Sequence, residues 1–129
     1  MTKARDIADS TKTLDVDGGT IKLDGNYPVG TSNVALGYTA LAALTSGSRN
    51  VAIGSNAADE ITTASDNTAV GYNNLANNTS GASNVALGSR SMQANTSGAN
   101  NVAVGFQSLT ANTTASNNTA VGYQAAYSN

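Results

Sequence analysis

The chain has 129 residues, of which 40% are hydrophobic and only 11% are charged, and its net charge is -2. Because it contains no His and no Cys, the sequence excludes Ser-His-Asp and Cys-His catalysis and the usual zinc sites. The weak negative charge provides no basic surface for nucleic acid. We therefore expect one domain that is not an enzyme, needs no cofactor or metal, and has no nucleic-acid partner.

The N-terminal residues 1–31 differ from the rest of the chain in their charge. Nine of the fourteen charged residues lie within residues 1–32. In residues 13–25, Leu14 and Val16 alternate with aspartates, Gly18 and Gly19 follow, and the alternation then resumes, which is the pattern of a β-hairpin. We predict that residues 1–31 form a short N-terminal segment that either attaches the protein to a larger assembly or caps the domain that follows.

Residues 32–129 consist of an internal repeat of 17 residues. The first of five complete copies starts at Asn33, and the others follow it without insertion. A sixth copy contains twelve residues. We number the positions of each copy from 1 to 17, so that position 1 is Asn, position 3 is Ala and position 5 is Gly in all six. We predict that these invariant residues hold the repeat structure: Asn33, Ala35, Gly37, Asn50, Ala52, Gly54, Asn67, Ala69, Gly71, Asn84, Ala86, Gly88, Asn101, Ala103, Gly105, Asn118, Ala120 and Gly122.

The first five positions of each copy alternate small and aliphatic residues, which is the two-residue period of a β-strand. The glycine at position 5 permits a sharp corner, and we expect a short extended segment at positions 6–9 and then a turn-rich return. A unit of 17 residues is too short for the paired helices of a helical repeat. The repeat predicts an all-β fold, a parallel β-solenoid (β-roll) of about six coils.

The alternation also gives each strand two different faces. Positions 2 and 4 place their aliphatic side chains on one face, while the invariant Ala and Gly lie on the other, where small residues would let a second chain approach closely. We expect the protein to associate with itself, most simply as a homotrimer. The alternative is a monomer whose Ala and Gly face meets water.

The repeat resembles known β-rolls. The unit NVAIG at residues 50–54 is similar to the NSVAIG-type head repeats of trimeric autotransporter adhesins, which form β-rolls joined as trimers, although those repeats are shorter. Residues 67–83 and 118–129 resemble repeats in bacteriophage tail fibres and other virion structural proteins, and residues 18–37 resemble the entry into such fibres. The resemblance covers residues 18–129 and implies a non-enzymatic structural protein.

The two resembled families differ in their cellular requirements. Residues 1–19 contain no apolar secretory segment, no apolar run is long enough to span a membrane, and no heptad segment follows the repeats. These features favour a virion protein made in the host cytoplasm, a phage tail fibre or a head-attached decoration spike, over a bacterial surface adhesin or a self-assembling extracellular filament. We expect residues 1–31 to bind another virion protein and no part of the chain to insert in a membrane.

Contact with a host glycan or receptor is expected on the exposed Asn, Ser and Thr faces and at the tip residues Tyr123 and Tyr127, with the alternative that Tyr127 covers the apolar end of the last coil. A threonine column at position 13, comprising Thr45, Thr62, Thr79, Thr96 and Thr113, suggests an ice-binding protein as a third alternative. Hydroxyl groups that cap local backbone groups are the preferred explanation of this column. Asp59 and Glu60 are adjacent, so an extended chain would point them to opposite faces and they make a poor acid-base pair.

Overall fold

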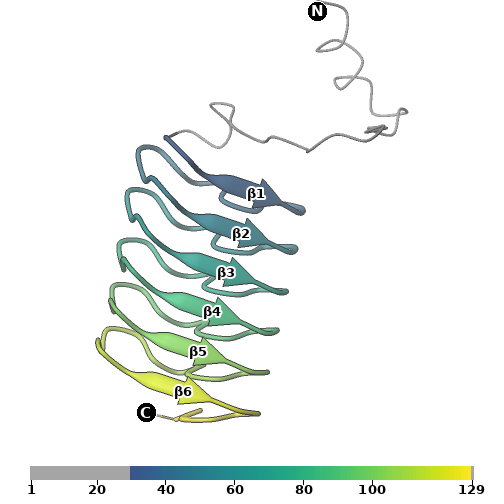
Figure 1. The fold of residues 1–129 in the computed structure, drawn as a ribbon, viewed down its shortest axis with the longest axis vertical. Coiled ribbons are helices and arrows are strands. Elements are labelled where there is room, and N and C mark those ends of the chain that lie inside the picture. The colour runs from purple at the N-terminus through teal and green to yellow at the C-terminus, as the bar shows by residue number, and fades with distance from the viewer. Residues whose placement is uncertain (1–29, 129) are drawn as a thin grey trace, which may run out of the picture.

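The computed structural model describes residues 30–128, and within them every regular element is a three-residue β-strand. The strands are β1 (Val34–Leu36), β2 (Val51–Ile53), β3 (Thr68–Val70), β4 (Val85–Leu87), β5 (Val102–Val104) and β6 (Thr119–Val121). They form one parallel sheet in sequence order, and the chain advances by one strand for each repeat (Figure 1). The predicted all-β, parallel β-solenoid is confirmed.

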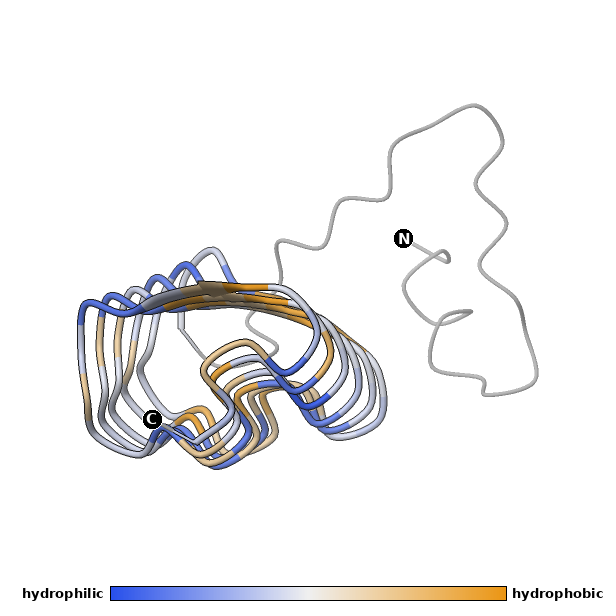
Figure 2. Ribbon diagram, turned by 90° about the horizontal axis from the view of Figure 1, so that it is seen from below, coloured by the Kyte–Doolittle hydropathy of each residue, from blue (hydrophilic) through white to orange (hydrophobic). Residues whose placement is uncertain are grey.

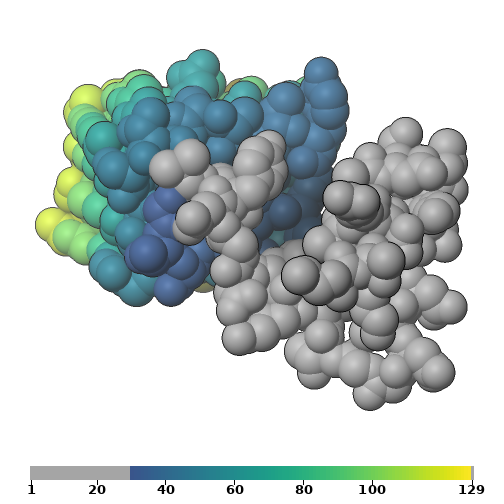
Figure 3. Space-filling view, turned by 90° about the horizontal axis from the view of Figure 1, so that it is seen from above, coloured from purple at the N-terminus to yellow at the C-terminus, as the bar shows by residue number. Residues whose placement is uncertain are grey.

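The sheet register follows the repeat without a shift. Ala52 of β2 pairs with Ala35 on one side and with Ala69 on the other, and each of these partners is 17 residues away. Equivalent positions of successive coils therefore form straight columns along the stack. The stacked arrangement begins before β1, at Thr31, whose backbone carbonyl accepts a hydrogen bond from the Arg49 amide (3.0 Å). Figure 3 shows the stack from the β1 end, with the later coils behind the first.

The hairpin predicted in residues 13–25 lies outside the described residues, as does nearly all of the predicted attachment segment, residues 1–31.

The interior of the solenoid is lined by the alanine column, which corrects our expectation about the two faces of the strand. Ala52, Ala69, Ala86 and Ala103 have no exposed area, whereas the side chains at positions 2 and 4 point outward. The return path is indented toward the sheet (Figure 2), and its buried side chains pack in one cluster with the alanine column. The expectation that the small residues face a second chain is therefore wrong for the alanines.

The remaining core comes mainly from the return path, at position 9 and, in the first two coils, at Leu44 and Ile61 of position 12. Leu41, Leu75, Met92 and Leu109 are at most 1% exposed and pack against the alanine column. The predicted extended segment at positions 6–9 is wrong, because this stretch consists of turns in which positions 7 and 9 have positive φ, as at Asn73 (51°) and Leu75 (50°). A left-handed residue costs about 1–2 kcal/mol, and burying a leucine contributes about 1.5–3 kcal/mol, so inward placement of Leu75 offsets its backbone cost.

The glycine at position 5 forms the corner that ends each strand. Gly71 has φ of +134°, and a Cβ atom there would lie 2.7 Å from the carbonyl oxygen of Gly88 in the next coil. Both the backbone conformation and the close stacking exclude a side chain. The predicted sharp corner is confirmed.

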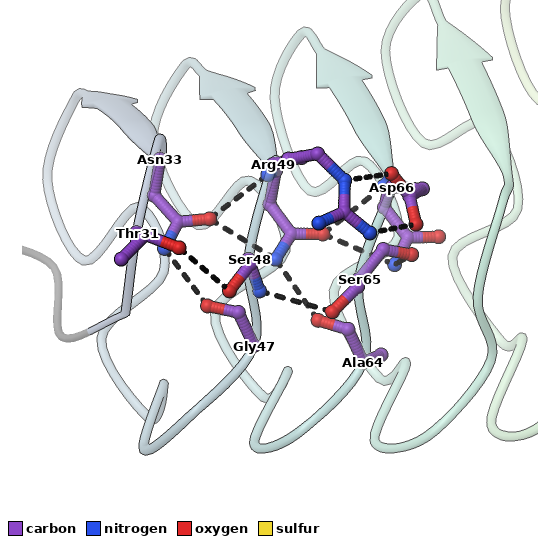
Figure 4. A network of polar contacts seen from close by, with 10 residues as sticks. Thr31, Asn33, Gly47, Ser48, Arg49, Ala64, Ser65 and Asp66 are labelled. Atoms are coloured by element: carbon purple, nitrogen blue, oxygen red, sulfur yellow. Dashed lines mark hydrogen bonds and ion pairs between the residues drawn. The ribbon is translucent and has the colours of Figure 1, made fainter.

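Asparagine side chains join the coils inside the stack, at position 1 in all six coils and at position 12 in the third to fifth, since the first two coils have Leu44 and Ile61 at position 12. At position 1, Asn50 donates from Nδ2 to the Ala64 carbonyl (2.9 Å), and its Oδ1 accepts the backbone N–H of Asn67 (3.0 Å). Figure 4 shows this arrangement repeated from Asn33 onward. At position 12, Asn95 donates to Asn78 Oδ1 (2.9 Å) and to the Gly98 carbonyl (3.0 Å). Buried amides are tolerated because neighbouring coils satisfy them.

Candidate interaction surface

The outward face of the sheet carries two apolar columns, which we call the outer face. Ten of its twelve side chains are Val, Leu or Ile, and several are substantially exposed, including Leu36 (47%), Ile53 (38%) and Val121 (69%). The outer face consists of Val34, Leu36, Val51, Ile53, Thr68, Val70, Val85, Leu87, Val102, Val104, Thr119 and Val121. The strand side forms a broad hydrophobic band (Figure 2).

Such a face is unusual for a sheet in contact with water. Solvated sheet faces normally carry polar residues, and parallel strands with apolar residues on both faces are typically covered on both sides. The outer face is also flat and free of charged residues, since its twelve positions hold only aliphatic residues and threonine. These properties make it the strongest candidate for an interface in the described part of the chain.

The predicted repeat residues are placed differently from the outer face. The asparagines of position 1 and the alanines of position 3 are buried or half-buried inside the solenoid, and the glycines of position 5 lie at the corner. The asparagines and alanines build the scaffold, and of the predicted repeat residues mainly the corner glycines reach the surface. Sequence analysis missed the outer face as a site because the alternation at positions 2 to 4 is equally compatible with either side pointing inward.

The two predicted tip tyrosines belong to different columns. Tyr123 is at position 6, is 73% exposed and stacks on Phe106 of the preceding coil, with ring centroids 5.6 Å apart. Tyr127 is at position 10 and is less exposed, and its backbone carbonyl accepts a hydrogen bond from the Ala111 amide (3.2 Å). Tyr123 therefore joins a longer aromatic column, whereas Tyr127 does not.

The threonine column at position 13 runs along the exposed turns. Thr45 Oγ1 donates to the Thr62 carbonyl (2.9 Å), and Thr62, Thr79 and Thr96 repeat this bond to the next coil. The hydroxyl groups thus cap backbone carbonyls, as predicted, but the carbonyls belong to the next coil and are not local to each threonine.

The charged side chains of the solenoid are few and do not gather into one cluster. Arg49 makes a two-pronged ion pair with Asp66 in the next coil (2.6 and 2.8 Å), and this hydrogen-bonded partner lowers the pKa of Asp66 and raises that of Arg49. Asp59 is half-buried, and burial raises the pKa of its carboxyl group, with a smaller contribution from Glu60. Residues 30–128 hold no group of three His, Cys, Asp or Glu side chains arranged for a metal ion.

The same residues include no helix that is long and apolar enough to cross a membrane. Comparison with protein-family models, with curated proteins and with solved structures gave no match to the chain.

Proposed function

We propose that the protein is a non-enzymatic virion structural protein, a phage tail fibre or a head-attached decoration spike, that works as a homotrimer. The observation that carries the proposal is the outer face, a flat apolar surface that runs over all six strands. Self-association through this face would remove its half-exposed side chains from water, and each aliphatic side chain that becomes fully buried contributes up to about 1.5–3 kcal/mol. The resemblance of the repeats to trimeric β-rolls supports three chains around one axis.

The proposed trimer differs from our sequence-based expectation in the surface that it uses. The aliphatic columns at positions 2 and 4 face the neighbouring chains, and the alanine column stays inside each solenoid. A closed trimer of this kind is a short rod segment, since six coils at about 4.8 Å each reach on the order of 29 Å. Such a rod suits a spike or fibre and requires no catalytic group.

The mass of the purified protein in solution tests the trimer. Light scattering or sedimentation should give three times the 12.8 kDa chain mass at micromolar concentration. A monomer or a dimer would contradict the trimer, and polydisperse polymers would favour the extracellular filament instead.

Virion location is tested separately. Mass spectrometry should find the protein in purified virions, and micrographs with a labelled antibody should show it on the tail or the capsid. Its absence from virions would overturn the proposed function even if the protein is a trimer.

The N-terminal segment, residues 1–31, is proposed to mount the protein on another virion protein. Deletion of residues 1–25 should leave a soluble oligomer that no longer joins virions, because the described coils begin after this segment. Loss of all folded protein on deletion would instead indicate that the segment only caps the first coil.

A further inference from the structure

The side chains at position 6 form an exposed column directly after the glycine corner, outside the outer face. The column runs Tyr38, Ser55, Tyr72, Ser89, Phe106 and Tyr123, and its four aromatic residues are all exposed. Phe106 and Tyr123 lie in adjacent coils and stack with an interplanar angle of 11°. These two rings therefore stack along the axis of the solenoid, and the Tyr72 ring turns a face toward Arg90 of the following coil.

The two serines open gaps in this aromatic column. The gap at Ser89 is partly occupied by the protein itself, because the Arg90 guanidinium lies over the Tyr72 ring, 6.0 Å from its centroid. The gap at Ser55 has a tyrosine in the adjacent coil on each side, Tyr38 and Tyr72, and these two tyrosines are two coils apart from each other. Two strand spacings separate these tyrosines by roughly 9.6 Å. We call the gap between Tyr38 and Tyr72, with Ser55 at its base, the aromatic slot.

We propose that the aromatic slot binds one ring of a neutral saccharide. A ring centred in the slot lies roughly 4.8 Å from each tyrosine, which is wider than the contact of about 3.5–4.0 Å between flat carbon surfaces. A planar ring would thus touch only one tyrosine well. A puckered sugar ring is thicker, since C–H bonds project from both of its faces, and can contact both tyrosines at once.

The polar groups beside the slot are uncharged and ordered. Thr39 Oγ1 donates to Asn56 Oδ1 (2.7 Å), and Asn56 Nδ2 donates to Asn73 Oδ1 (3.0 Å). A primary amide carries two N–H donors, and the bond to Asn73 uses one of those of Asn56. Fixed amide and hydroxyl groups beside aromatic rings suit the hydroxyl groups of a neutral sugar, and no carboxylate stands at positions 6 or 7 of the first three coils to attract a cation.

This inference deepens the contact with host glycans expected for the proposed virion fibre and rests on that function for its biological role. Binding at the aromatic slot itself needs neither a virion nor a trimer. The two proposals can therefore fail separately: the saccharide experiment leaves the oligomer mass unaffected, and the mass measurement does not depend on the slot.

Saturation-transfer NMR of the full chain with methyl glycosides of glucose, galactose, mannose and N-acetylglucosamine tests the slot. At least one glycoside should receive saturation, with a dissociation constant on the order of 1 mM for so small a ligand. Ser55→Tyr should abolish the transfer, because the new ring fills the slot with a stack like that of Phe106 and Tyr123. Tyr38→Ser should weaken binding about tenfold or more.

Ser89→Tyr is the matched control, since it adds the same ring to the other gap of the column and should leave binding unchanged. Unaltered circular dichroism and thermal midpoints of both tyrosine variants would show that they fold. No transfer to any glycoside at tens of millimolar, or equal transfer to wild type and Ser55→Tyr, would overturn the proposal. It would also be wrong if Ser55→Tyr lowered the oligomer mass, because the slot would then hold a ring from a second copy of the chain.

Discussion

The asparagine at position 1 connects three segments of the chain through one side chain. Asn84, which has no exposed area, donates from Nδ2 to the Gly98 carbonyl (2.8 Å), and its Oδ1 accepts the backbone N–H of Asn101 (2.9 Å). The first bond closes the turn of its own coil and the second fixes the start of the next strand. The asparagine amide carries its acceptor and its donors on separate atoms, so one short side chain reaches both partners, whereas a serine hydroxyl has a single oxygen for both roles.

Replacing this asparagine should therefore be costly. Asn84→Ala leaves the Asn101 N–H without its partner and removes one of the two donors to the Gly98 carbonyl, which keeps its bond from Asn95; an unsatisfied buried group costs about 1–3 kcal/mol. Urea unfolding should show a loss of about 1–3 kcal/mol. The exposed Asn77 supplies the control, because Asn77→Ala should change stability by less than about 0.5 kcal/mol. Equal effects of the two variants would contradict the role of the buried ladder.

Asp59 is a residue that opposes folding in its charged form. Its Oδ1 is buried without a hydrogen-bond partner, and burial raises the pKa of the carboxyl group. Because the folded pKa lies above the unfolded one, the fold binds the proton more tightly, and stability is lost as the pH rises through the folded pKa. The equivalent residues of the adjacent coils are Ala42 and Ala76.

Asp59→Ala should consequently stabilise the protein at neutral pH by about 0.5–1 kcal/mol. The gain should shrink below about pH 3, where the carboxyl group is protonated in both states. Thermal unfolding of wild type and variant at the two pH values measures this difference, with Asn77→Ala as the exposed control. A gain that does not depend on pH would attribute the effect to packing and not to charge.

Each coil is built from one strand, one glycine corner and one return path, and the sequence predicted these parts unequally. The strands and their register follow directly from the 17-residue period and the alternation of the first five positions. The direction of the alternation does not follow, since Val-Ala-Leu can bury either the alanine or its neighbours. The left-handed turn at position 9 could not be predicted either, because leucine has no intrinsic preference for positive φ, and Ala58 and Ala126 adopt the same conformation at this position.

Two of the corner glycines allow the cost of the backbone conformation to be measured separately from the cost of steric contact with the next coil. Gly105 and Gly122 have nearly equal φ, +131° and +129°, but only at Gly105 would a Cβ atom collide with a carbonyl oxygen, that of Gly122. Gly122→Ala should cost about 1–2 kcal/mol for the left-handed backbone alone. Gly105→Ala should cost more by at least about 1 kcal/mol, since the coils must shift apart. Denaturant unfolding measures both, and equal losses would mean that the contact is relieved without cost.

At the scale of the whole molecule, the residues that pack inside each solenoid are different from the outer-face residues that we propose as the trimer interface. Leu87 lies in the middle of the outer face on β4, and its side chain points away from the interior. A charge at this position would leave the core of the coil untouched but would be buried in a trimer without a partner.

Leu87→Lys should therefore convert the trimer to monomer with little change in the β-sheet signal of circular dichroism. Sedimentation analysis at micromolar concentration measures the mass. Asn77→Lys places the same charge on an exposed turn and should leave the trimer intact. Retention of the trimer by Leu87→Lys would show that the outer face is not the interface.

The unbroken period of the columns also determines how such a chain can change its length. Removal of residues 67–83 joins Asp66 to Asn84 and leaves every remaining residue at its old position, so the solenoid becomes one strand spacing shorter and is otherwise unaltered. Removal of one residue more or fewer would instead leave one coil out of phase with its neighbours, because neighbouring strand residues face opposite sides, and the return path at the junction would have to absorb the difference. Changes by whole repeats are therefore the changes in length that keep every column of the stack intact.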